Sequence, residues 1–301
     1  MNVNSNWHQR AAELKPDGRA FVAGQRVASL SGATFDKHSP LDGRLLAPIA
    51  DGQSADIDVA VADARAAFVS GVWSARAPSA RKRVLQRFAE LIRAHKDELA
   101  LLETLDMGKP IGDSLKVDVP STARCIEWYA EAIDKIYGEV APTASTVLAT
   151  ITREPLGVVG AIVPWNFPLI MTAWKVAPIL AAGNSLVLKP SEKSPLSALR
   201  LAELAIEAGV PPGVFNVVTG HGDPCGQVLT SHPLVQRISF TGGPESARHI
   251  IRNSAENFAQ VSLELGGKSP FLVFEDADLE SAVNGAISGI FGATGQSCVA
   301  G

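Results

Sequence analysis

Residues 158–190, VVGAIVPWNFPLIMTAWKVAPILAAGNSLVLKP, contain two short apolar runs separated by a longer apolar stretch. The runs at 158–164 and 185–190 have the length and apolar character of buried strands, whereas the stretch between them has the length of a helix and is closed by Gly183. A strand, a helix and a second strand in succession form a unit whose two strands lie parallel and are covered on both faces. This stretch therefore predicts an α/β fold.

The same alternation continues to residue 266. The five expected strands are VVGAIVP (158–164), SLVLKP (185–190), FNVVT (215–219), RISFT (237–241) and QVSLEL (260–265). The four expected helices span about 168–182, 195–208, 223–231 and 244–257. Five strands joined by four helical crossovers predict a doubly wound, Rossmann-like parallel sheet, in which ligands bind beyond the carboxyl ends of the strands.

The segments on either side of this sheet have other patterns. Apolar residues recur at helical spacing over 55–105, after several short β-type runs, and a further helix is expected over 118–137. Residues 138–155 are rich in Thr, Val and Ile with partial alternation, which predicts an extended hairpin arm. One more strand, SPFLVFE (269–275), and a helix from about Asp278 are expected near the end.

The composition excludes several classes of protein. The 27 Lys and Arg residues are outnumbered by 31 Asp and Glu residues, and the resulting net charge of −4 argues against a general nucleic-acid binder. The longest apolar stretches, at 156–165 and 168–183, are broken by Pro164 and Lys175 and are too short for a membrane span of about 20 residues. The first residues carry no apolar segment behind a basic flank, so a cytoplasmic protein is expected.

The three cysteines, Cys125, Cys225 and Cys298, are an odd number at irregular spacing, which indicates neither a disulfide framework nor a metal site. Reduced thiols and no bound metal are therefore expected. Cys125 and Cys225 lie in expected helices and are interpreted as small buried hydrophobes. Cys298 follows a Gly-Gln-Ser turn whose backbone amides would favour an exposed thiolate, although a buried structural thiol is the alternative.

Each expected strand is followed by a loop rich in Gly, Pro and charged residues. The loops are PWNFP (164–168), KPSEKSP (189–195), GHGDPCG (220–226), TGGPE (241–245) and ELGGKSP (264–270). Taken singly, such loops are ordinary turns with solvated charges. Because the carboxyl ends of parallel strands meet at one edge of a sheet, five of them together indicate a ligand site.

Two of these loops carry signals for a nucleotide. Glycines at 220, 222 and 226 are spaced GxGxxxG, one residue longer than the dinucleotide fingerprint and after the third strand instead of the first, so this signal is weak. Lys189 and Glu192 are more informative, because a carboxylate beyond a strand can accept both hydroxyls of a ribose while an ammonium holds the ribose oxygen. Glu192 would repel a 2′-phosphate, which favours NAD over NADP.

Motifs along most of the chain resemble those of the aldehyde dehydrogenase superfamily, from about Phe21 to the end. The segments that carry the resemblance are PWNFP, LVLKPSEKSP (186–195), NVVTG (216–220), ISFTGG (238–243), LELGGKSP (263–270) and FGATGQSC (291–298). Stretches such as ALLETLDMGKP (100–110) and WYAEAIDKIYGEV (128–140) are most similar to bacterial enzymes of putrescine breakdown that oxidise γ-glutamyl-γ-aminobutyraldehyde. The resemblance implies NAD-dependent oxidation of an aldehyde to a carboxylic acid.

The resemblance also implies a role for each catalytic residue. Cys298 matches the nucleophile that forms a thiohemiacetal and then a thioester. Asn166 matches the amide that, with the backbone N–H of Cys298, stabilises the oxyanion. Glu264 matches the base that activates water for thioester hydrolysis, and its presence argues against a CoA-acylating enzyme. Lys175 matches a lysine close to the active site.

The cofactor site implied by the resemblance lies at the same sheet edge. Lys189 and Glu192 match the adenosine-ribose contacts. Apolar residues expected to line the cofactor cleft are Ile162, Pro164, Trp165, Phe240 and Leu265. Glycines expected to let the pyrophosphate and adenine approach the backbone are Gly222, Gly226, Gly242 and Gly243. The family commonly has Ser at position 243, so one hydroxyl contact is lost, whereas the backbone N–H groups of that helix end can still bind phosphate.

Four parts follow from the resemblance: an N-terminal helical part of the cofactor domain (1–137), an oligomerisation arm (138–155), an NAD-binding core (156–266) and the beginning of a second α/β catalytic domain (267–301). A homo-oligomer, dimer or tetramer, is implied for the complete enzyme. Family members continue well beyond the position of Gly301, so residues 1–301 alone are expected to be incomplete and inactive.

Two alternatives stay open. The chain is either an NAD-dependent aldehyde dehydrogenase or a non-catalytic nucleotide-binding or assembly module built from the same half. The resemblance implies that the helix preceded by Asp113 and Asp118 borders the mouth of the aldehyde channel. These two carboxylates would there attract an aminoaldehyde's ammonium group, or they would be solvated or cap a helix.

Overall fold

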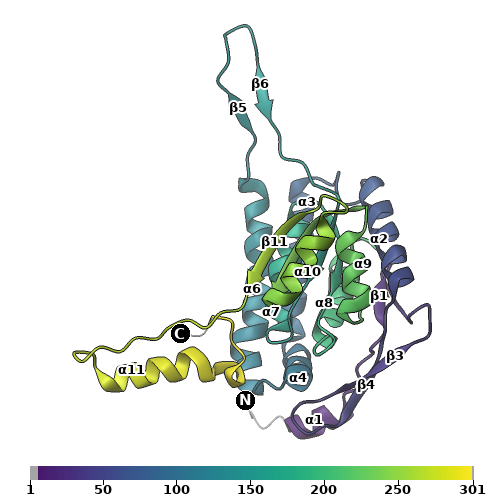
Figure 1. Cartoon of the computed structure of the whole chain (residues 1–301). Helices are drawn as coiled ribbons and strands as arrows, with labels where there is room; N and C mark the ends of the chain where they lie inside the picture. The colour runs from purple at the N-terminus through teal and green to yellow at the C-terminus, as the bar shows by residue number, and fades with distance from the viewer. Residues whose placement is uncertain (1–5, 300–301) are drawn as a thin grey trace.

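The computed structural model describes residues 6–299 and contains a seven-stranded mixed sheet between two layers of helices (Figure 1). The strand order is β11-β10-β7-β8-β9-β1-β2. Five neighbouring strands run parallel: β7 (Val158–Ile162), β8 (Ser185–Lys189), β9 (Phe215–Val217), β10 (Val235–Gly242) and β11 (Gln260–Leu265). These are the five expected strands, and the α/β fold class is confirmed.

Two further strands extend the sheet beyond the predicted five. β1 (Ala20–Val22) pairs antiparallel with β9 through Phe21 and Val217, and β2 (Gln25–Val27) forms the outer edge. Both strands have three residues, so neither is long enough to show an alternating pattern in the sequence. A second small antiparallel sheet is formed by β3 (Thr34–His38) and β4 (Leu45–Ala50).

The two faces of the sheet are buried in separate cores. Successive residues of β8 show the alternation, since Leu186 and Leu188 belong to one core and Val187 to the other. The larger core is covered by α3 (Pro78–Ala94), α6 (Val119–Ala132), α7 (Pro168–Ala181) and α8 (Leu196–Ala208). The other core is covered by α2 (Ser54–Val69), α9 (Gln227–Ser231) and α10 (Pro244–Ser254).

Several helix ends differ from the prediction. The helix expected over 223–231 is a π-type turn at Gly222–Gly226 followed by the short α9, and α10 ends at Ser254 instead of residue 257. The helix expected over 118–137 extends from a π segment at Ser114–Asp118 through α6 to a 3-10 turn that ends at Lys135. α1 (Trp7–Glu13) and α4 (Lys96–Met107) complete the N-terminal part. No helix within residues 6–299 is long and apolar enough to cross a bilayer.

The expected hairpin at 138–155 is present. β5 (Glu139–Ala141) and β6 (Ala149–Ile151) pair antiparallel and project away from the rest of the molecule, at the top of Figure 1. The arm exposes apolar side chains, and Leu148 is 78% exposed.

The strand predicted at 269–275 is absent, and this prediction was wrong. The backbone there is irregular and has no strand partner among the described residues. An extended segment without a partner cannot satisfy its backbone hydrogen bonds by pairing, whatever its apolar content. The helix expected from about Asp278 is confirmed as α11 (Leu279–Ala286), and the Asp278 side chain accepts a 2.7 Å hydrogen bond from the Ser281 amide. α11 lies to one side of the sheet and its helices (Figure 1).

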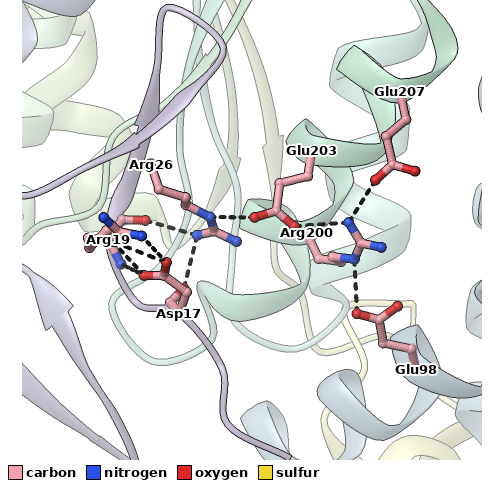
Figure 2. Close-up of polar contacts among 7 residues, drawn as sticks. All are labelled: Asp17, Arg19, Arg26, Glu98, Arg200, Glu203 and Glu207. Carbon is pink, nitrogen blue, oxygen red and sulfur yellow. Dashed lines mark hydrogen bonds and ion pairs between the residues drawn. The ribbon is translucent and has the colours of Figure 1, made fainter.

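Ion pairs connect the β1–β2 edge to the helices behind it (Figure 2). Arg26 in β2 lies 2.6 Å from Glu203 in α8, and Arg200 contacts the same carboxylate at 2.9 Å. Arg200 also pairs with Glu98 of α4 at 2.9 Å and with Glu207 at 3.1 Å. Because several charges share partners, this network fixes the short edge strands better than isolated surface pairs would.

Candidate active site

The loops that follow four of the five parallel strands, β7, β8, β9 and β10, line a cleft of about 520 Å³ at the carboxyl edge of the sheet. Ten of the eleven predicted cofactor residues line it: Ile162, Pro164, Trp165, Lys189, Glu192, Gly222, Gly226, Phe240, Gly242 and Gly243. The eleventh, Leu265, ends β11 opposite Gly242 and is not among the lining residues. The cleft thus occurs where a doubly wound sheet is expected to bind its ligand.

Lys189 and Glu192 lie together in this cleft. Lys189 is 3% exposed, and its Nζ donates a 3.0 Å hydrogen bond to the Pro190 carbonyl. The Glu192 Oε2 atom is 3.9 Å from this Nζ, and the Glu192 side chain is partly exposed. Burial lowers the pKa of Lys189, while the nearby Glu192 acts in the opposite direction. The pair offers one buried donor and one accessible acceptor to a ligand with hydroxyl groups.

Glycine is suited to each of these positions in the cleft for a different structural reason. A Cβ atom built at Gly222 or Gly243 meets no described atom within 4 Å, so both leave open space beside the backbone. Gly226 instead faces the Lys189 side chain, and a Cβ at Gly242 would lie 2.5 Å from the Phe240 ring. Gly243 is the N-cap of α10, so the unpaired amides and positive dipole end of this helix border the cleft.

The sequence interpretation missed several lining residues. Four of them share one face of α10, at the i, i+3, i+4 and i+7 spacing of a helix: Ser246, His249, Ile250 and Asn253. Applied to the helix after the fourth strand, this periodicity would have identified them. The other missed residues are Ser191, Lys193 and Asp223 in loops or turns, Gln227 and Thr230 in α9, and Thr241 in β10. They follow no comparable pattern.

The Asn166 side chain meets the segment that carries Cys298, 130 residues later in the chain. Its Nδ2 donates a 3.0 Å hydrogen bond to the Gln296 carbonyl. Cys298 follows two residues later in a turn, and its side chain is half-buried. The structure therefore brings together the predicted nucleophile and the loop with the predicted oxyanion donor.

The charge of Glu264 acts on Lys175. Lys175 lies in α7 and is buried, and burial lowers the pKa of its ammonium group while the Glu264 charge opposes that change. Glu264 lies near the end of β11, one residue before Leu265, and is exposed. The partial desolvation expected for a general base is thus not provided by the residues that the structure describes.

The remaining cysteines and the two aspartates considered for substrate binding lie outside the cleft. Burial raises the pKa of the Cys125 thiol to about 11 and that of the Cys225 thiol to about 12, which leaves both protonated near neutral pH. Asp118 is buried, and its carboxylate accepts a 2.8 Å hydrogen bond from Lys109. Asp118 therefore does not attract a substrate from solvent, whereas Asp113 is partly exposed.

Comparison with known proteins identifies the family. The model of the aldehyde dehydrogenase family matches residues 27–301. The chain belongs to this family. It is 52% identical to the NADP/NAD-dependent aldehyde dehydrogenase PuuC of Escherichia coli over 98% of this chain and 60% of that protein. It is 47% identical to the aminoacetaldehyde dehydrogenase of Pseudomonas aeruginosa over 96% of this chain and 59% of that protein.

Solved structures of aldehyde dehydrogenases have the same fold. Indole-3-acetaldehyde dehydrogenase of P. syringae, solved with NAD⁺ and IAA, superposes with a TM-score of 0.97 at 53% identity, covering 100% of this chain and 61% of that chain. For the γ-glutamyl-γ-aminobutyraldehyde dehydrogenase of Burkholderia cenocepacia, the TM-score is 0.96 at 55% identity, covering 99% and 60%. The chain spans about 60% of the length of these aldehyde dehydrogenases.

Proposed function

We propose that the protein oxidises an aldehyde to the carboxylic acid, with Cys298 as the nucleophile and NAD as the hydride acceptor. The observation that carries the proposal is the 3.0 Å contact between the Asn166 amide and the Gln296 carbonyl. This contact joins the Cys298 turn to the loop whose residues Pro164 and Trp165 line the cleft. A thiol, an amide donor and a cofactor-sized cleft thereby share one edge of the sheet.

The chemistry proceeds on the Cys298 sulfur. The thiolate adds to the aldehyde carbon, and the electron pair of the C=O bond moves to the oxygen, where the Asn166 amide and the Cys298 N–H donate hydrogen bonds. Loss of a hydride from this carbon leaves a thioester. Glu264 then takes a proton from water, and the resulting hydroxide attacks the thioester carbon, releasing the acid and restoring the thiolate.

The residues of the cleft fit NAD. Lys189 and Glu192 would hold the adenosine ribose, and the open space at Gly222 and Gly243 beside the start of α10 would admit the pyrophosphate. Bound NAD supplies an acceptor for the hydride. The apolar side chains of Ile162, Trp165 and Phe240 would bury its rings.

An aminoaldehyde, such as γ-glutamyl-γ-aminobutyraldehyde, is the proposed substrate. The similarity to the B. cenocepacia enzyme of that name supports it. Relatives named for aminoacetaldehyde and indole-3-acetaldehyde are similar at 47% and 53% identity. A panel containing these three aldehydes, assayed with the protein expressed from its complete coding sequence, ranks them by kcat/KM.

A non-catalytic NAD-binding or assembly module is the second candidate. The cleft supports it, because its lining residues lie between Ile162 and Asn253 and include neither Cys298 nor Glu264. An assay of NADH formation with NAD and an aldehyde distinguishes the two candidates. The enzyme forms NADH, whereas a binding module binds NAD and forms no NADH.

The test compares three cysteine variants of the protein expressed from its complete coding sequence. Cys298→Ala should lower NADH formation by about a thousandfold or more, because no hydride leaves before the tetrahedral adduct forms. Cys125→Ala and Cys225→Ala are the matched controls and should stay near the unmutated rate. Calorimetry should show that Cys298→Ala still binds NAD. Equal loss of activity in all three variants would refute the assignment.

A further inference from the structure

Three charged side chains are buried together behind the loop that carries Asn166. Glu103 in α4 and Asp118 are 0% exposed, and Lys109 between them is 1% exposed. The Lys109 Nζ lies 2.8 Å from Asp118 Oδ1 and 3.9 Å from Glu103 Oε1. Removing ionisable groups from water costs free energy, and pairing them recovers only part of it, so this buried cluster lowers the stability of the core unless its contacts compensate.

Lys109 also contacts the residue next to Asn166. Its Nζ lies 3.9 Å from the centre of the Phe167 ring. An ammonium over an aromatic face is attracted by the ring quadrupole, and more strongly where water is excluded. The contact fixes the plane of the Phe167 ring and restrains the backbone on the C-terminal side of Asn166.

Glu103 holds the next part of the same segment. Its carboxylate accepts a 3.2 Å hydrogen bond from the Leu169 amide, in the first turn of α7, and a 3.1 Å bond from the Ser197 hydroxyl in α8. A carboxylate at the start of a helix satisfies a free amide and interacts favourably with the helix dipole. Burial raises the pKa of Glu103 to about 8, and the charge of the nearby Lys109 opposes this change.

The cluster and the Asn166 contact act on neighbouring residues of one short loop. Phe167 and Leu169 are held from behind by Lys109 and Glu103, while the Asn166 amide reaches forward to the Gln296 carbonyl. We propose that Lys109 is a positioning residue that acts through Asn166, setting the direction of its amide toward the Cys298 turn. The proposal rests on the proposed function, in which this amide stabilises the oxyanion.

A positioning role and a general stabilising role predict different double-mutant results. If Lys109 acts through Asn166, its replacement has no further effect once the Asn166 amide is gone. If Lys109 only stabilises the core, its effect adds to that of Asn166 and extends to distant parts of the fold.

The first measurement needs no turnover. Cys298 alkylation by iodoacetamide is followed by peptide mass spectrometry in Lys109→Met, Asn166→Ala and the double variant, all from the complete coding sequence. Loss of the Asn166–Gln296 bond should loosen the turn and raise the alkylation rate about threefold or more. Lys109→Met should raise it similarly, and the double variant should match Asn166→Ala.

Two controls accompany this cycle. Lys116→Met changes an exposed lysine seven residues away and should leave the rate unchanged. Cys225 is buried with its thiol pKa raised to about 12, so its slow alkylation reports that each variant is folded. If Lys109→Met does not fold, Lys109→Gln replaces it in the same cycle, because Gln keeps a polar side chain at this buried position and lacks the ammonium charge.

The second measurement is aldehyde oxidation by the same proteins. Lys109→Met should lower kcat at unchanged KM for NAD, and the double variant should be no slower than Asn166→Ala. The proposal would be overturned if the losses in kcat of the two single variants multiply in the double variant. It would also be overturned if the rate of Cys298 alkylation is unchanged in Lys109→Met. An unmutated protein that forms no NADH with any aldehyde would refute the proposed function instead, and the alkylation cycle would still decide the role of Lys109.

Discussion

At the scale of single residues, we propose that the Lys189–Glu192 pair decides which nucleotide the cleft accepts. The buried ammonium at 3.9 Å from the carboxylate already has a partner of opposite charge. A neutral ribose with two hydroxyls can bridge the two groups, whereas a 2′-phosphate would compete with Glu192 for the same position and be repelled by it. We therefore expect the pair to favour NAD, whereas the PuuC relative is named for both nucleotides.

Removing the Glu192 charge should relax this bias. In Glu192→Gln, we expect the ratio of kcat/KM for NADP to that for NAD to rise by about tenfold, because the repulsion is lost and one ribose contact is weakened. The exposed Glu256→Gln in the same protein is the control for a simple change in net charge. A preference for NADP in the unmutated protein would contradict this role of Glu192.

At the scale of elements, α4 contacts the helices that follow two of the loops of the candidate site. Glu103 and Asp106 are one turn apart on this helix, and both are buried. Glu103 accepts a 3.2 Å hydrogen bond from the Leu169 amide at the start of α7. Asp106 accepts a 2.7 Å hydrogen bond from the Leu196 amide at the start of α8. Because α7 follows the Asn166 loop and α8 follows the Glu192 loop, one helix fixes the positions of both.

The pH dependence of stability should reveal the buried Asp106. Burial raises its pKa from 3.8 to about 7, and the nearby Lys37 ammonium opposes the change. The folded state therefore binds this proton more tightly than the unfolded state does, so the contribution of Asp106 is complete below about pH 4 and is lost as the pH rises through 7. Between pH 5 and pH 7 the loss should be about 2 kcal/mol.

Urea unfolding at these two pH values measures this loss. Asp106→Asn cannot ionise, so its free energy of unfolding should fall less than that of the unmutated protein over the same interval. Asp42→Asn, which changes an exposed carboxylate, should follow the unmutated protein. Parallel pH profiles for all three proteins would show that Asp106 does not titrate in this range.

The elements that were predicted correctly have strong local patterns. β7, α7 and β8 follow from apolar runs of the right length, with Gly183 between the helix and the second strand. The wrong prediction at 269–275 had an equally apolar pattern, but a strand exists only where a neighbour pairs with it. Glu103 and Asp106 were not predicted as buried residues, because carboxylates in a helical pattern are usually solvated and their partners are 66 and 90 residues away.

At the scale of the whole molecule, the sequence predicts the edge of the sheet where the site lies but not the contacts across it. Lys189 and the cleft glycines follow from their positions after strands. The Asn166–Gln296 bond joins residues 130 apart, and no local pattern specifies it. The resemblance to a family, and not spacing, suggested that these two segments would meet.

The projecting hairpin gives a prediction at this scale. Val140, Leu148 and Ile151 are exposed on a two-stranded arm, and such apolar surface on an element of marginal stability indicates an interface with another copy of the chain. Replacing residues 139–151 by a short Gly-Ser turn should reduce the molar mass found by light scattering and leave NAD affinity within about twofold. Leu41→Ser, at an exposed leucine elsewhere, should change neither quantity. An unchanged molar mass would contradict the assignment of the arm.

The central claim, that an aldehyde is oxidised on Cys298 and released with the help of Glu264, is tested most directly by trapping the thioester. Glu264→Gln in the complete protein is mixed with NAD and an aldehyde, and the quenched protein is analysed by intact and peptide mass spectrometry. We predict one burst of about one NADH per site, little turnover afterwards, and an acyl group of the substrate's mass on the Cys298 peptide. Continued turnover without a burst, or an acyl group on another residue, would contradict the account.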